Sequence, residues 1–183
     1  MRAPTDPPSS NPDPTTYPSG TTELQTRAMG IAALTCIGFM LLGSLLGWLT
    51  TAEVDMKWYE ALVRPGFQPP EVLTLLVALL YYPLFFVLIY RSLTRLPGAS
   101  ERKAAVTLAV TAMAINTAWN PLLIGFQALA LGVIGHGILL GVIGLLAGFL
   151  WRRERLSAIL LLPYVIWVAF DLLWALELLR LNP

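Results

Sequence analysis

The stretch EVLTLLVALLYYPLFFVLIYRSL, residues 71–93, decides the fold. Its only charged side chains are Glu71 at the first position and Arg91 near the last. An apolar segment of about 18 or more residues can cross the roughly 30 Å hydrocarbon core of a bilayer as a helix. We therefore expect residues 71–93 to span a membrane.

Four further segments of similar length and composition flank this one. They cover residues 28–50, 103–124, 126–150 and 156–179. The chain is 56% hydrophobic and 13% charged, with a mean hydropathy of +0.68, whereas soluble domains carry about 25% charged residues. Peptide groups in lipid must be paired within the protein, which favours helices, and the alternating ten-residue segments of a membrane β-barrel do not occur. The sequence predicts an all-α membrane protein, a five-transmembrane-helix bundle within residues 27–183.

Residues 1–26 differ in composition from the rest of the chain. They include PTDPPSSNPDPTTYPSG, residues 4–20, which is rich in Pro, Ser, Thr and Asp. Such a segment cannot bury enough apolar surface to offset the entropy of folding, so we expect a disordered polar N-terminal tail. The basic-then-apolar layout of a cleaved signal peptide is missing, and the first span is expected to be retained.

The basic residues predict an orientation in the membrane. Nine of the twelve precede the first span or lie in or next to the connections after the second and fourth spans, which five spans would place on one side. They are Arg2, Arg27, Arg91, Arg95, Arg102, Lys103, Arg152, Arg153 and Arg155. Because Lys and Arg favour the cytoplasmic side, we expect the N-terminus inside and the C-terminus outside. The net charge of +1 gives no indication of a nucleic-acid partner.

The connection between the first two spans is unusually long for a compact bundle. It reads TAEVDMKWYEALVRPGFQPP, residues 51–70, and includes the aromatic residues Trp58, Tyr59 and Phe67. Connections of this length are usually functional, which favours a lid over a cavity between the helices. The alternative is an aromatic belt that anchors the loop at the membrane interface.

Three stretches of this sequence resemble the TspO/MBR family, the tryptophan-rich sensory and translocator proteins. WYEALVRPGFQPP is similar to the first family signature, and two others follow in the right order. These are INTAWNPLLIG, with Asn116, Trp119 and Pro121, and LLPYVIWVAF, with Pro163, Tyr164 and Trp167. The resemblance covers residues 28–182 and implies five helices around a ligand cavity. It implies porphyrin or haem as the ligand, sterols less so, and a sensing, transport or scavenging role with no required cofactor.

Helical spacing indicates a pocket independently of this resemblance. Tyr164, Trp167 and Asp171 recur at intervals of three and four and therefore share a helix face, as do Asn116 and Trp119. Polar groups in a membrane normally face the bundle interior, and aromatic walls with few polar groups suit a flat apolar ligand. The alternative is ordinary helix packing, with Asn116 and Asp171 bonded to each other or to the backbone. The expected ligand-binding set, part of it implied by the resemblance, is Trp58, Tyr59, Phe67, Tyr82, Asn116, Trp119, Tyr164, Trp167 and Asp171.

The sequence departs from the family pattern at pocket positions. The family usually has a Trp four residues before the Tyr aligned with Tyr82, where this chain has Ala78. The family's Asn in the last span aligns with Ala175, a family Ala aligns with Asp171, and Pro83 is unexpected. We therefore expect the fold to carry over more safely than the ligand.

Motifs for catalysis or for a metal site do not occur, so we expect neither. The only histidine, His136, lies in a glycine row that continues through Gly141, Gly144 and Gly148. Small residues at this spacing mark close helix contact, which favours a contact role for His136 over a metal or haem ligand and also offers a homodimer face. Cys36, the only cysteine, excludes an intrachain disulfide. Two alternative functions remain: a proton- or cation-coupled carrier using Asp171, and light-dependent porphyrin degradation, which is proposed within the family.

Overall fold

The computed structural model describes residues 19–53 and 57–183, and in these ranges it is built from helices. Five of them are long and apolar enough to cross a membrane, as the hydropathy predicts. The elements are α1 (Ser19–Glu53), α2 (Lys57–Glu60), α3 (Glu71–Arg95), α4 (Ala99–Gly125), α5 (Leu129–Trp151) and α6 (Arg155–Leu181). The expected all-α membrane bundle is confirmed.

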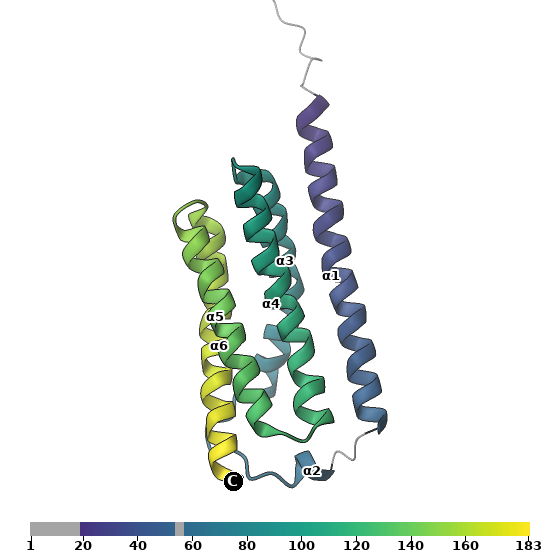
Figure 1. The fold of residues 1–183 in the computed structure, drawn as a ribbon, viewed down its shortest axis with the longest axis vertical. Helices are drawn as coiled ribbons and strands as arrows, with labels where there is room; N and C mark the ends of the chain where they lie inside the picture. The colour runs from purple at the N-terminus through teal and green to yellow at the C-terminus, as the bar shows by residue number, and fades with distance from the viewer. Residues whose placement is uncertain (1–18, 54–56) are drawn as a thin grey trace, which may run out of the picture.

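The long helices run up and down along one axis (Figure 1). The strongest packing is between α5 and α6 and between α4 and α5, while α1 lies at one edge against α3 and α4. The start of α1 and the α3–α4 and α5–α6 connections lie at one end of the bundle, and α2, the α4–α5 turn and the C-terminus lie at the other (Figure 1). The start of α1 and the two basic connections therefore lie at one end, while Arg2 lies outside the described residues.

Three boundaries differ from those predicted. The helix α1 begins at Ser19, so residues 19–26 of the predicted tail are helical, where Glu23 and Arg27 pair one turn apart at 2.5 Å; residues 1–18 lie outside the described residues. The fourth span begins at Leu129 instead of Phe126, because Gln127 takes a left-handed backbone (φ 49°) in the turn. The loop after the first span contains the short helix α2.

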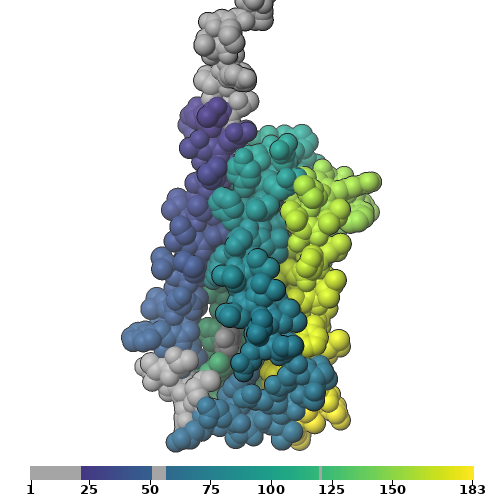
Figure 2. All heavy atoms as spheres, turned by 180° about the vertical axis from the view of Figure 1, so that it is seen from behind, coloured from purple at the N-terminus to yellow at the C-terminus, as the bar shows by residue number. Residues whose placement is uncertain are grey.

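Side chains sort by environment as a bilayer requires. The buried core is mostly apolar and comes mainly from α3, α4, α5 and α6, with Phe85, Leu139 and Leu161 each at most 1% exposed. Large apolar side chains also cover the outside, such as Leu34, which is 73% exposed, and Ile166, which is 69% exposed. In hydrocarbon this exposure carries no penalty. Figure 2 shows one such face, on which α3 lies between α1 and α6.

An ion pair joins α3 to the start of α6. The guanidinium of Arg91 donates to both carboxylate oxygens of Glu154, at 2.5 and 3.2 Å, and its Nε also reaches the hydroxyl of Ser157 at 3.2 Å. Glu154 is in addition the N-cap of α6, since its side chain accepts from the Ser157 amide at 2.8 Å. Burial alone would raise the pKa of Glu154, but the bonds from Arg91 and Ser157 hold this pKa below its ordinary value.

Removing this carboxylate should destabilise the bundle in a pH-dependent way. Since the Glu154 pKa is lowered by folding, its contribution is complete above the ordinary carboxyl pKa of about 4.3 and is lost as the pH falls through the folded value. We expect Glu154→Gln to cost about 2 kcal/mol at pH 7, and the difference from wild type to vanish under acid conditions. Thermal unfolding in detergent from pH 7 to pH 3 measures this.

The matched control is Glu177→Gln, which removes an ion pair with the exposed Arg180 (70% exposed) at the other end of α6. Such a pair contributes about 0–1 kcal/mol. An equal loss in both variants would contradict a special role for Glu154.

Candidate functional site

A cavity of about 380 Å³, here called the inner cavity, lies among α3, α4, α5 and α6. Its size falls in the range of small-molecule sites, about 300–1,000 Å³. Its lining is aromatic with a few polar groups. The lining residues are Thr74, Val77, Ala78, Tyr81, Tyr82, Asn116, Trp119, His136, Tyr164, Trp167, Asp171 and Trp174.

The polar groups of α4 and α6 are held by specific contacts. The hydroxyl of Tyr164 donates to Oδ1 of Asn116 at 3.1 Å, so the amide of Asn116 pairs with this tyrosine. The indole of Trp167 lies one helical turn before Asp171, close enough for a side-chain interaction with its carboxyl. Asp171 takes part in none of the ion pairs found in the described residues. Asn116 thus bonds across the bundle to Tyr164, and a bond between Asn116 and Asp171 is not found among the described residues.

Two buried donors at the cavity have no partner among the described residues, the hydroxyl of Tyr81 and the indole N–H of Trp174. Leaving a buried donor unpaired costs about 1–3 kcal/mol. A ligand with an acceptor atom would remove this penalty by accepting from Trp174.

A second hollow, the outer chamber, adjoins the inner cavity beneath the loop. Its volume is about 540 Å³, and the loop residues Tyr59, Arg64, Gln68 and Pro69 line it together with α3 and α6. Burial raises the pKa of Tyr59, and the nearby charge of Arg64, 5.8 Å from the ring centre, partly offsets this. The two hollows share Thr74, Ala78, Trp167, Asp171 and Trp174.

Ala78 lies where the two hollows meet. It lines both of them, and its methyl group stands where the family pattern has an indole. The small side chain leaves open the space that an indole at this position would fill. The departure from the family pattern therefore bears directly on how much room a ligand has.

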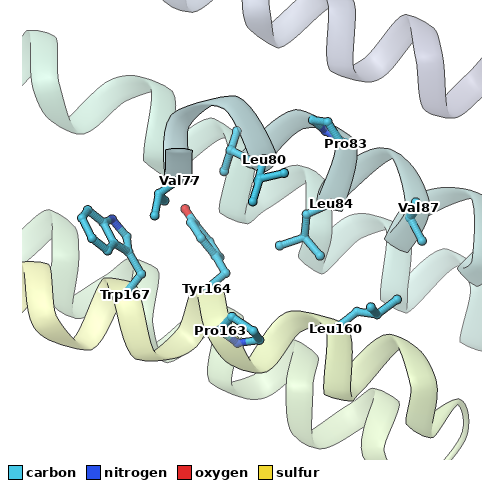
Figure 3. Close-up of a pocket in the computed structure, with 10 residues that line it drawn as sticks. Val77, Leu80, Pro83, Leu84, Val87, Leu160, Pro163, Tyr164 and Trp167 are labelled. Atoms are coloured by element: carbon cyan, nitrogen blue, oxygen red, sulfur yellow. The ribbon is translucent and has the colours of Figure 1, made fainter. Parts of the chain in front are cut away.

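A third hollow, the lateral groove, opens between α3 and α6 toward the lipid-facing side (Figure 3). It measures about 370 Å³ and is almost wholly apolar. Pro83 of α3 and Pro163 of α6 both line it, and Leu80 at its edge is 54% exposed. Tyr164 and Trp167 line the groove and the inner cavity alike.

The structure brings most of the predicted site residues together, but two lie elsewhere. Trp58 packs on a small cluster of Leu123, Leu129 and Leu178. Phe67 lies edge-on to Phe170, with the two ring centres 6.1 Å apart. Neither lines the hollows described above. The seven that do are Tyr59, Tyr82, Asn116, Trp119, Tyr164, Trp167 and Asp171.

Sequence reasoning missed His136 as a cavity residue. The ring lies 4.4 Å from Trp119, so the expected helix contact is present, and it also borders the inner cavity. A signal was available, because Trp119 and His136 are almost equally far from the turn at Gln127, and antiparallel helices bring such positions level.

A clamp holds the loop over this end of the bundle. The side chain of Asn182 accepts from the amide of Val63 at 2.9 Å and donates to the carbonyls of Val63 at 3.0 Å and Leu178 at 2.8 Å. One amide thus ties the loop to the last turn of α6. The sequence resemblance extends to this residue, without indicating its partner.

Groups of three or more metal-ligating side chains are not found among the described residues. A bundle of five long apolar helices defines an integral multi-pass membrane protein. The sequence profile of the TspO/MBR family matches residues 34–180. The chain belongs to the TspO/MBR family.

Relatives from bacteria and animals match most of the chain. Tryptophan-rich protein TspO of Chlorobaculum tepidum is 28% identical over 81% of this chain and 94% of its own length. Translocator protein of Sus scrofa is 30% identical over 75% of the chain and 83% of its own length. Protein CrtK of Rhodobacter capsulatus is 32% identical over 69% of the chain and 79% of its own length.

Breaking the clamp should free the loop. In Asn182→Ala the Val63 amide and carbonyl lose their partner, so we expect backbone amides of residues 57–68 to exchange at least about tenfold faster, which corresponds to about 1.4 kcal/mol. Hydrogen–deuterium exchange with mass spectrometry measures this. Arg180→Gln, a change at the same end outside the clamp, should leave the exchange unaltered, and unchanged exchange in Asn182→Ala would exclude the clamp.

Proposed function

We propose that the protein binds a flat, largely apolar ligand of the porphyrin or haem class in the inner cavity. The observation that carries this proposal is the position of Trp167, which lines the lateral groove, the inner cavity and the outer chamber. An indole wall shared by three adjoining hollows offers stacking surface along a path from the bilayer side to the loop side. Sterols, which are not flat aromatic molecules, fit this wall less well.

A role in transport, sensing or scavenging follows more readily than turnover. Relatives are called translocator protein and tryptophan-rich protein, and the cavity residues include no paired nucleophile and base. Porphyrin degradation is the weaker alternative, because Ala78 replaces a family tryptophan at the cavity.

Loss of cavity tryptophans should weaken porphyrin binding. We expect Trp119→Ala and Trp167→Ala each to cost about 1–3 kcal/mol in binding, because each removes stacking surface. Titration of the detergent-purified protein with protoporphyrin IX, followed by the fluorescence of the porphyrin, gives the affinities.

The control is Trp48→Ala at the end of α1, where the side chain is 66% exposed and outside the cavity. Its affinity should stay within about twofold of wild type. An equal loss at Trp48 would indicate general destabilisation and would remove the support for this pocket.

A carrier that uses Asp171 as a proton or cation site is the second candidate. It is favoured by one observation, a half-buried carboxyl at the cavity that takes part in no ion pair within the described residues. Charged groups in a membrane are costly and usually functional. A carrier would require this carboxyl for coupled movement, whereas a binding protein would use it only to hold the ligand.

Asp171→Asn separates these functions. For a binding protein we expect porphyrin affinity or its pH dependence to change by about threefold or more while thermal stability stays near wild type, since Asn keeps the size and one acceptor. For a carrier, vesicles loaded with protein should lose ligand-driven proton movement. Unchanged binding at every pH, together with a lower melting temperature, would assign Asp171 to packing.

We further propose that the N-terminus is cytoplasmic, because the start of α1 and the two basic connections lie at one end of the bundle. Reporter fusions after Leu96 and after Arg155 should be inside, and one after Gly66 outside. A cytoplasmic signal at Gly66 would reverse this topology.

A homodimer would use the outer face of α5. Gly137, Gly141, Gly144 and Gly148 have open space where a side chain would stand, whereas Gly132 and Gly135 contact α4. Rows of small residues allow helices to approach closely in lipid.

A further inference from the structure

His136 is a buried imidazole at the inner cavity, and it has no role in the proposed stacking of the ligand on tryptophan. It lies on α5, is 4% exposed and lines the cavity together with the aromatic residues of α3 and α6. It is also the only histidine in the sequence. Any imidazole chemistry of this chain therefore belongs to His136.

One hydrogen bond fixes which ring nitrogen is available. Nδ1 lies 2.8 Å from the carbonyl oxygen of Gly132, one turn earlier on α5. A carbonyl only accepts, so Nδ1 carries the proton, and Nε2 of the neutral ring keeps its lone pair. This is the ring's one hydrogen bond among the described residues, which leaves Nε2 able to bind an electron acceptor at the cavity.

Close packing of α4 against α5 holds the ring in place. Trp119 packs on the imidazole with ring centres 4.4 Å apart. This approach depends on Gly135, where an added Cβ would lie 3.1 Å from Cβ of Trp119, and on Gly132, where it would meet Leu123 at 2.6 Å. The ring is therefore held by an indole tilted at 53° to it and, at Nδ1, by a carbonyl.

We propose that His136 is the axial ligand, through Nε2, of the iron in a haem bound in the inner cavity. This inference rests on the proposed function and sharpens it, because the site would then distinguish metal-loaded from metal-free porphyrin. Proximal ligation by His is a common way to hold haem iron. Metal-binding histidines usually donate their second ring N–H to a carbonyl or carboxylate, as Nδ1 does here.

The test uses the full-length chain without a histidine tag, purified in detergent and titrated with ferric haem and, separately, with protoporphyrin IX. The absorption spectrum and the iron–imidazole vibration of the reduced complex report the axial ligand. Because His136 is the only histidine, an imidazole signature in the wild type can come only from this residue. A haem complex without that signature overturns the inference and leaves the proposed function standing.

Variants provide the second arm. In His136→Ala we expect haem affinity to fall about 10–100-fold, the range known for loss of metal-site support, with the imidazole signature lost and partly restored by added imidazole. The affinity for protoporphyrin IX, which carries no iron to ligate, should fall by a smaller factor than the affinity for haem, and its binding also shows that the variant is folded. If His136→Ala binds neither haem nor protoporphyrin IX, His136→Asn provides a second variant of the same position. The presence or absence of the imidazole signature in the wild-type haem complex still tests the inference. Failure of the wild type to bind either porphyrin would instead overturn the proposed function.

Discussion

Hydrocarbon offers no hydrogen-bond partner, and this constraint governs both the helices and the cavity between them. Each long helix pairs its own peptide groups, so the remaining polar side chains must find partners inside the bundle. The bonds of Tyr164 to Asn116 and of His136 to Gly132 are two such solutions. Apolar residues such as Ile166 face outward without penalty. A cavity that is polar at a few points and aromatic elsewhere is therefore an inward surface kept apart from lipid.

The α4–α5 hairpin gives this cavity one of its walls. The left-handed backbone of Gln127 makes the turn tight, and the two helices then run back along each other. Gly132 and Gly135 provide the space for Leu123 and Trp119 of the facing helix. A side chain at Gly135 would bring a Cβ to 3.1 Å from Cβ of Trp119, so the indole would have to shift. The glycines near the turn thus position the site, while those farther along α5 face open space.

Hydropathy predicted the five spans because a bilayer imposes one length and one composition on every crossing helix. Helical spacing predicted the shared face of Tyr164, Trp167 and Asp171, since phase within one helix is fixed by its geometry. No such rule fixes how one helix is rotated relative to its neighbour. The sequence therefore predicted a helix contact for His136 but not its place at the cavity. Loops have no period at all, so Trp58 and Phe67 could be assigned to the cavity only through the family resemblance.

The departures from the family pattern fit together in space. With alanine at position 78, α3 supplies a gap where an indole is usual, and the indoles at this end of the cavity come from Trp167 and Trp174 of α6. Asp171 stands between them on the same helix face, at intervals of four and three residues. Two of the three indoles that line the inner cavity, and its one carboxylate, thus lie on α6. On the proposed function, α6 would contact the face of a flat ligand, and the room left by Ala78 would decide how far that ligand extends toward the loop.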